Sequence, residues 1–261
     1  MHRSSERAPV TRWPSGRSEL DLLAVEEPLQ IRVEGQPLAV LLRTPGHDLE
    51  LVAGFLLTEG LIDGPDDLAA LAHVGAPDTL LHNTVDCRLA SGIDPARVDA
   101  RRRDRLASSG CGLCGKTTLD QLHSTVPPLD APLPLAPHIP SAVAAALRGY
   151  QPGFGATGAL HGAALFTADG ALVLTREDVG RHNAIDKVLG RMLLDDRLPL
   201  SHLGLLVSSR AGYEVVQKAL VARIGAVVTI GAATSLAVQV ARASRMSLWG
   251  FTREDRATRY V

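Results

Sequence analysis

The second half of the chain alternates strand-like apolar runs with amphipathic helical patterns, and this alternation limits the possible folds more than any other feature. In chain order these segments lie at 141–148, 163–167, 171–175, 181–194, 203–207, 213–224, 226–230, 235–244 and 247–251. Only the second and third of them, two strand-like runs around Gly170, lack a helix between them and read as a hairpin. Strands that alternate with helices are joined by right-handed crossovers, so the pattern predicts a mainly parallel sheet with helices on both faces. We therefore expect an α/β domain over 137–261.

The first half predicts a smaller α+β region over 19–136. Runs at 29–33 and 38–42 are typical of the two strands of a hairpin, and an amphipathic helix follows from about Asp48. Residues 1–18 are polar, charged and interrupted by proline, so we expect a mobile N-terminal tail there.

A proline-rich segment separates the two regions. Six prolines lie between Pro127 and Pro140. This density excludes a regular helix or a central strand, because proline lacks the backbone N–H group that both structures use. The segment is therefore the predicted connection between the domains.

Charge and cysteine content exclude several classes of protein. The formal net charge is −1, so no global positive field favours bulk nucleic acid as a partner. The three cysteines form an odd set that is unlike a secreted disulfide framework. The first residues lack the apolar core of a signal peptide, and no uncharged apolar stretch reaches the roughly 18 residues that span a bilayer. These features predict a cytoplasmic protein that has no membrane partner.

Two of the three cysteines, Cys111 and Cys114, lie among glycines in a short loop at about 108–117. Glycine favours neither a helix nor a strand, so the segment is predicted to be a flexible loop that presents paired thiols beside Lys116. Thiolates are both nucleophiles and metal ligands, so the loop indicates either sulfur chemistry or a metal.

Several kinds of thiol site use two cysteines at this spacing. A structural zinc ion needs four ligands, which Cys87, His82 or His123 would have to complete, since no second cysteine pair exists. A zinc deaminase is excluded because no histidine is followed two residues later by glutamate. A thioredoxin-like motif would begin a helix after a strand, and that context is missing here. The residues therefore favour a mobile arm that carries sulfur as a cysteine persulfide, with zinc as the open alternative.

Polar loops follow three successive predicted strands. In an open α/β sheet, ligands bind beyond the carboxyl ends of the strands, where these loops meet. Hydroxyl, small and cationic residues are enriched at 208–212, 231–235 and 252–256. Each loop by itself is consistent with simple helix caps, whereas together they favour a phosphate-bearing ligand such as a nucleotide. The candidate residues in the first loop are Ser208, Ser209 and Arg210.

Three segments of the chain resemble the signature blocks of the FdhD family. They are Ser109–Gly115, Arg176–Lys187 and Ser209–Ala219, and the likeness runs from about Leu20 to Tyr260. Without the family resemblance, the charged residues of the second block, Arg176–Lys187, are equally consistent with a surface cluster of ion pairs and with part of a site.

The resemblance implies a sulfurtransferase, a sulfur carrier protein required for formate dehydrogenase activity. A cysteine desulfurase would supply the sulfur, and the recipient would be the molybdenum bis-guanine-dinucleotide cofactor before its insertion into formate dehydrogenase. The resemblance also implies that a guanine nucleotide such as GDP mimics that bound substrate. The family also implies a cytidine deaminase-like fold for the second half and a homodimer.

The resemblance further assigns site residues. Cys111 would carry the persulfide with Cys114 as its partner, and no metal is implied. The cofactor-binding segment carries over to Phe251, Thr252, Arg253, Glu254, Asp255 and Arg256. Glu254 and Asp255 depart from the family pattern, and two acids should weaken the binding of an anion there.

A function of another class is a non-enzymatic chaperone that binds the nucleotide-bearing cofactor, with the cysteines as metal ligands or as a lock on the loop. A Cys111→Ala variant separates the two hypotheses. A chaperone would still support formate dehydrogenase without this thiol, whereas a carrier would not.

Overall fold

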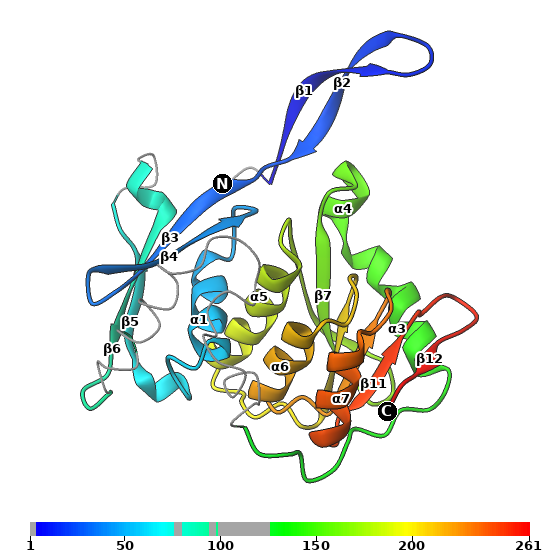
Figure 1. Cartoon of the computed structure of the whole chain (residues 1–261). Coiled ribbons are helices and arrows are strands. Elements are labelled where there is room, and N and C mark those ends of the chain that lie inside the picture. The colour runs from blue at the N-terminus through cyan, green and yellow to red at the C-terminus, as the bar shows by residue number, and fades with distance from the viewer. Residues whose placement is uncertain (1–3, 76–79, 94–97, 99–125) are drawn as a thin grey trace.

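A computed structural model describes residues 4–75, 80–93, 98 and 126–261 (Figure 1). Within these ranges the strands form a six-stranded, a four-stranded and a two-stranded sheet. The cysteine loop predicted at about 108–117, with Cys111 and Cys114, lies outside the described residues. In the described part of the chain, no helix is both long and apolar enough to cross a membrane.

The six-stranded sheet belongs to the second half of the chain. Its strands, in spatial order, are β12 (Thr258–Arg259), β11 (Ser247–Gly250), β10 (Ala226–Thr229), β9 (Leu203–Val207), β7 (His161–Thr167) and β8 (Leu172–Asp178). Strands β9, β10 and β11 pair in parallel, as expected for strands joined by helices.

The prediction of a mainly parallel sheet needs correction, because the described sheet is mixed. Strand β7 is antiparallel to both β8 and β9, and β12 is antiparallel to β11. The predicted hairpin around Gly170, whose φ is 91°, is confirmed, and it reverses the chain between β7 and β8. The hairpin joins the sheet through β7, which pairs antiparallel with β8 on one side and with β9 on the other.

Helices cover both faces of this sheet. One face carries α3 (Ile139–Leu147), and the other carries α5 (Arg181–Leu194), α6 (Tyr213–Val221) and α7 (Ser235–Ala243). Successive residues of β9 point to opposite sides, so Leu205 packs with α5 and α6 while Leu206 packs with α3. The three layers agree with the predicted α/β class, and the cytidine deaminase-like detail stays a prediction.

The predicted α+β region in the first half contains the four-stranded sheet. Its elements are β3 (Glu27–Val33), β4 (Gln36–Arg43), α1 (Asp48–Thr58), β5 (Leu68–His73) and β6 (Thr84–Leu89), with the strands in the order β4, β3, β6, β5. The hairpin predicted from two alternating runs is confirmed as β3 and β4, which pair antiparallel. Helix α1 buries almost all of its residues against this sheet and α5.

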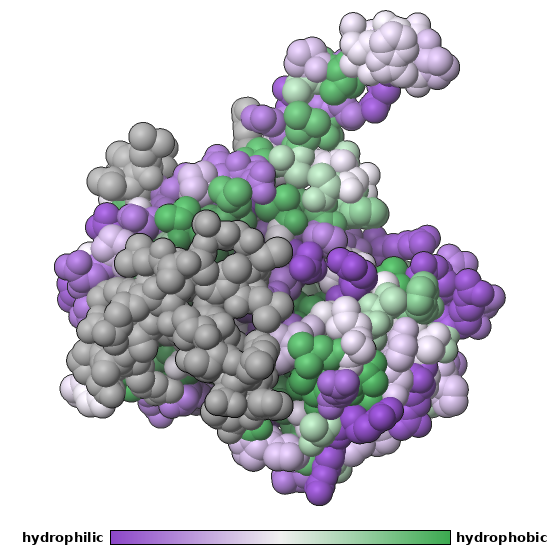
Figure 2. Space-filling model, viewed as in Figure 1, coloured by the Kyte–Doolittle hydropathy of each residue, from purple (hydrophilic) through white to green (hydrophobic). Residues whose placement is uncertain are grey.

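The N-terminal segment differs from the expected tail, because it forms a hairpin of β1 (Ser5–Arg12) and β2 (Arg17–Ala24) that projects from the body (Figure 1). Arg12 bonds Glu19 at 2.6 Å and Asp21 at 2.7 Å on one face. Figure 2 shows apolar surface along the hairpin. Leu20, in the middle of β2, is 65% exposed. The composition of this segment resembles that of a disordered tail because it is rich in charged residues. In the structure, charges are paired across the two strands.

Helices α1 and α5 join the two regions, and they approach each other through two glycines. A Cβ atom on Gly54 would lie 1.9 Å from the backbone oxygen of Asp186, and one on Gly190 would lie 1.8 Å from that of Glu50. No side chain fits in either place, since real Cβ atoms do not come that close to backbone. The two helices therefore pack backbone against backbone.

Replacing either glycine by alanine should force the helices apart. We expect Gly54→Ala and Gly190→Ala each to lower the free energy of unfolding by about 2 kcal/mol or more, as overpacking does. Urea unfolding followed by circular dichroism measures this change.

Gly149→Ala is the matched control, because a Cβ there meets nothing within 4 Å. It should change stability by less than about 0.5 kcal/mol. If the two interface variants behaved like this control, the close approach of the helices would be wrong.

Candidate functional site

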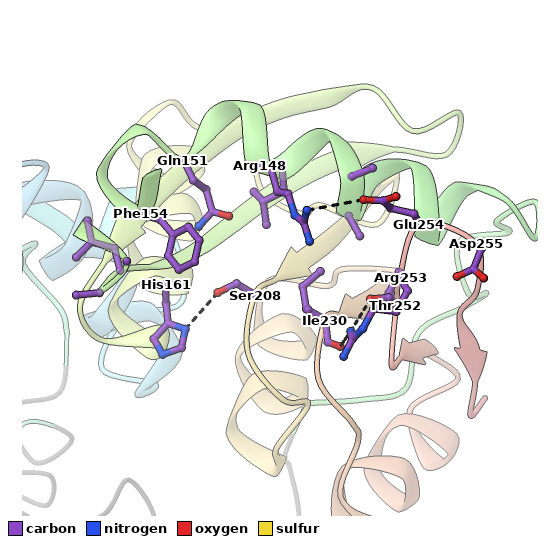
Figure 3. A pocket seen from close by; sticks show the side chains of 16 residues that line it. Arg148, Gln151, Phe154, His161, Ser208, Ile230, Thr252, Arg253, Glu254 and Asp255 are labelled. Atoms are coloured by element: carbon purple, nitrogen blue, oxygen red, sulfur yellow. Dashed lines mark hydrogen bonds and ion pairs between the residues drawn. The ribbon is translucent and has the colours of Figure 1, made fainter. Parts of the chain in front are cut away.

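A cavity of about 680 Å³ lies at the carboxyl ends of β9, β10 and β11, between that sheet edge and the segment after α3 (Figure 3). The antiparallel β7 begins at the same edge with His161. The opposite wall comes from the end of α3 and from α4 (Pro152–Thr157), a short helix that the sequence analysis did not predict. A ligand was expected at this edge of the sheet. Of the three predicted polar loops, those at 208–212 and 252–256 contribute residues to the cavity, whereas no residue of 231–235 lines it.

The structure brings only some of the predicted binding residues to the cavity. Those that line it are Ser208, Thr252, Arg253, Glu254 and Asp255.

The other predicted binding residues lie nearby without lining the cavity. The buried Ser209 hydroxyl donates to the Arg210 backbone oxygen at 3.2 Å. Arg210 is exposed and packs over Gly231, while Phe251 is 51% exposed with a positive φ. Arg256 is exposed.

Sequence reasoning missed the wall opposite the sheet edge. Arg148, Gln151 and Phe154 line the cavity from this side. The segment that carries them contains proline and several glycines, so its sequence lacks the apolar spacing that predicts a helix. Only the exposed aromatic ring, in a chain with few aromatic residues, offered a signal.

His161 and Ser208 form a polar pair at one end of the cavity. The histidine Nδ1 lies 3.2 Å from the serine Oγ, which also accepts a hydrogen bond from the Gly162 backbone N–H at 3.0 Å. Burial lowers the pKa of His161, and the positive charges of Arg181 and His182 lower it further. Because Ser208 Oγ already accepts from Gly162, its hydroxyl can donate to Nδ1 of a neutral imidazole.

The two acids that depart from the family pattern lie at the mouth of the cavity. Glu254 approaches Arg148 at 3.7 Å, and these side chains are 81% and 79% exposed. Such an exposed pair contributes little electrostatic energy. Arg253 donates to the backbone oxygen of Ile230 at 2.9 Å, so its cation is held at the end of β10.

The charged block at 176–187 ties the two regions together. Asp178 is fully buried and accepts from the Thr44 backbone N–H at 3.2 Å, while Lys187 Nζ lies 2.7 Å from its carboxylate. Asn183 donates from the same site to the Leu42 backbone oxygen at 2.8 Å. The sequence left two hypotheses for this block, a surface cluster of ion pairs or part of a site. The structure shows that Asp178 and Lys187 form an ion pair, which is buried rather than on the surface.

A second buried pair acts in the same way. Lys218 Nζ contacts the two carboxylate oxygens of Asp186 at 2.8 and 2.9 Å and the hydroxyl of Thr58 at 2.7 Å. Thr58 ends α1, so this contact also joins α1 to α5 and α6.

Cys87 is confirmed as a core thiol. It is fully buried in the N-terminal sheet. Burial raises the pKa of the Cys87 thiol to about 12, and the negative charges of Asp86 and Glu34 act in the same direction. Because the thiolate is the metal-binding form, Cys87 is a poor candidate for completing a zinc site. Among the described residues, no group of three or more His, Cys, Asp or Glu side chains is placed to hold a metal ion.

Cys87 should therefore resist alkylation in the folded protein. We expect iodoacetamide at about pH 8 to leave Cys87 unmodified, because almost no thiolate forms and reagent access is blocked. Peptide mass spectrometry measures the modification, and the same reaction in urea is the control in which Cys87 reacts. Equal rates in the two conditions would contradict the buried placement.

The Glu50 and Arg176 pair should make stability depend on acid pH. Burial raises the pKa of Glu50, but hydrogen bonds from Arg176 and His47 outweigh it and lower the pKa from 4.5 to about 2. The ionised form is thus favoured by folding, and its contribution is lost as the pH falls from about 4.5 toward 2.

We therefore expect wild-type protein to lose more stability between about pH 5 and about pH 3 than Glu50→Gln does. Urea midpoints across this range give the comparison. Asp130→Asn, at an exposed position, should keep the wild-type slope. A Glu50→Gln slope equal to that of the wild type would show that this pair does not set the dependence.

Comparisons with known proteins agree on one family. Residues 24–261 match the model of the FdhD/NarQ family. A sulfur carrier protein FdhD from Anaeromyxobacter dehalogenans is 44% identical over 256 residues, which are 95% of this chain and 89% of that protein. One from Mycobacterium tuberculosis is 44% identical over 249 residues, 92% of this chain and 90% of that protein.

A solved structure supports the fold. It is that of a formate dehydrogenase accessory protein from Desulfotalea psychrophila, with 22% sequence identity and a TM-score of 0.72 over 98% of this chain and 95% of that one. The family model and the two relatives confirm the family expected from the three sequence blocks. The chain belongs to the FdhD/NarQ family.

Proposed function

We propose that this chain is a sulfur carrier that serves formate dehydrogenase. Its support is the high identity to proteins named sulfur carriers over nearly the whole chain. The chain also has the pair Cys111 and Cys114 in a glycine-rich segment, which is the thiol chemistry that such a function needs.

The proposed reaction is sulfur transfer through a persulfide on Cys111. The Cys111 thiolate attacks the terminal sulfur of a persulfide on a cysteine desulfurase. A new S–S bond forms on Cys111, and the donor cysteine leaves as a thiolate. The buried Cys87 is unsuited to this attack, because its thiol stays protonated.

Release of the sulfur needs a second thiol or a reducing acceptor. Attack of the Cys114 thiolate on the Cys111 sulfur would break the S–S bond, release sulfide and leave a Cys111–Cys114 disulfide. A cellular dithiol must then reduce that disulfide before the next cycle. The two residues would thus carry and discharge the sulfur in turn.

The acceptor in this proposal is the molybdenum bis-guanine-dinucleotide cofactor, bound as a substrate before insertion into formate dehydrogenase. The observation that carries this part is the cavity at the sheet edge, where Arg148 and Arg253 supply cations and Thr252 supplies a hydroxyl. Backbone and cationic groups at such an edge are suited to phosphate. A homodimer stays a prediction.

The chaperone alternative shares the cofactor cavity and differs only in the role of the cysteines. It predicts nucleotide binding as the carrier does. Two observations therefore separate the carrier from the chaperone. They are the formation of a persulfide on Cys111 and the requirement for Cys111 in cells.

Intact-protein mass spectrometry after incubation with a cysteine desulfurase and cysteine tests the carrier chemistry. We expect wild-type protein to gain the mass of one sulfur atom and Cys111→Ala to gain none, because the persulfide forms on that thiol. The matched control is the double variant Cys111→Ala/Cys114→Ala, which keeps Cys87 and should also gain none.

The same Cys111→Ala variant should fail to restore formate dehydrogenase activity in cells that lack their own family member. Restoration at the wild-type level would reject the carrier and support the chaperone. A sulfur that stays with the double variant would place the persulfide on Cys87 and contradict the assignment.

A further inference from the structure

The β1–β2 hairpin that projects from the body has two unlike sides. Residues directly opposite each other in an antiparallel pair share a side, so the register assigns every side chain of the hairpin to one of them. The first side is charged, and on it Arg12 pairs with Glu19 and Asp21. The second side is mainly apolar, and its apolar residues are Pro9, Leu20, Leu22 and Ala24.

The apolar side of the hairpin is largely uncovered. Leu20 is 65% exposed, and Figure 1 shows that the hairpin extends away from the body. A hairpin of only two strands is at best marginally stable in water unless its apolar side packs against something. This side therefore has the character of a surface that another protein covers.

The tip of the hairpin carries the residue type that contributes most to protein interfaces. Trp13 lies in the turn between the two strands and is 83% exposed, in a chain with only 3% aromatic residues. Tryptophan, tyrosine and arginine are the side chains that most often anchor one protein on another. A second exposed aromatic residue, Tyr150, lines a cavity of about 490 Å³ together with Ser4 and Ser5 at the base of the hairpin.

The charge on the apolar side argues for a partner other than a second copy. Among the residues of β1 and β2, all of which the structure describes, Arg7 is the only charged one on this side. Two copies of the side placed together would carry two arginines and no carboxylate between them, so they would not complement each other. A different protein with an acidic residue beside an apolar groove would match both features.

The position of the hairpin indicates which protein this is. Strand β2 contacts α4, and α4 carries Phe154 and forms one wall of the cavity at the sheet edge. A protein that is held by the hairpin therefore lies next to that cavity, which in the proposed function holds the cofactor before its transfer.

We propose that the β1–β2 hairpin is a docking arm for cofactor-free formate dehydrogenase. Trp13 anchors the arm in an apolar pocket of the enzyme, Leu20 packs in the adjoining groove, and Arg7 pairs with a carboxylate at its border. This inference rests on the proposed function, in which the enzyme receives the cofactor from this chain.

Biolayer interferometry with the full chain immobilised and cofactor-free formate dehydrogenase in solution tests the inference. Trp13→Ala and Leu20→Ser should each weaken binding by about tenfold or more, because both remove apolar contacts that the enzyme covers. Arg7→Glu should slow association severalfold at low salt, and the difference should shrink at high salt because exposed charges are screened.

Leu194→Ala is the matched control. Leu194 is also an exposed apolar residue, at 43%, but it lies at the end of α5 and outside the hairpin. This variant should bind the enzyme as the wild type does. Because Trp13 and Leu20 are exposed as well, circular dichroism should show the same fold in all variants.

Wild-type affinity in both Trp13→Ala and Leu20→Ser would overturn the inference. So would a Trp13→Ala variant that binds the enzyme normally but no longer accepts sulfur from a cysteine desulfurase, since the arm would then serve the donor. Light scattering that shows a dimer in the wild type and a monomer in Trp13→Ala would assign the arm to a second copy instead. The persulfide on Cys111 is measured without the enzyme, so failure of the carrier function is distinguishable from failure of this inference.

Discussion

The close packing of α1 on α5 is the contact on which the rest of the structure depends. Gly54 and Gly190 allow the two backbones to meet, and no side chain of any size would permit this. Helix α5 then serves both cores, because Leu193 packs into the N-terminal core while Ile185 packs under the six-stranded sheet. The buried pairs of Lys187 with Asp178 and of Lys218 with Asp186 lie along the same interface. Burying these charges is costly unless each is paired, so separating α1 from α5 would leave them without their partners.

Asp178 and Lys187, from the sequence block at 176–187, hold this interface together and do not line the cavity. The cavity lies at the same edge of the six-stranded sheet, since His161 pairs with Asp178, but it is lined by the ends of β9, β10 and β11 and by the segment after α3. Its walls carry the half-exposed Phe154 ring and two arginines, Arg148 and Arg253. Together these groups offer an aromatic surface and cations in one cavity. They support the proposal that the nucleotide part of a large cofactor binds there.

Much of this fold follows from the sequence, and the failures have physical causes. The spacing of apolar residues and the positions of turn residues predicted the order of helices and strands in the second half, because these elements depend on the local sequence. They did not predict the strand directions, which depend on how the β7–β8 hairpin joins its neighbours. The β1–β2 hairpin was missed because its charges are paired across strands, and α4 because its glycines give no period.

The same contrast holds for the site. The loops after β9 and β11 were found from the rule that ligands bind at the carboxyl ends of strands. Gln151 and Phe154 were not found, because the segment that carries them has no helical pattern and meets the sheet edge only in the folded chain.

We propose that the sulfur delivered to formate dehydrogenase comes from this chain. Its most direct test is a chase of protein loaded with a ³⁵S persulfide into molybdenum cofactor and apo-formate dehydrogenase. We predict that label leaves the carrier and appears with the enzyme as activity rises. Activity that rises while the label stays behind would contradict the account.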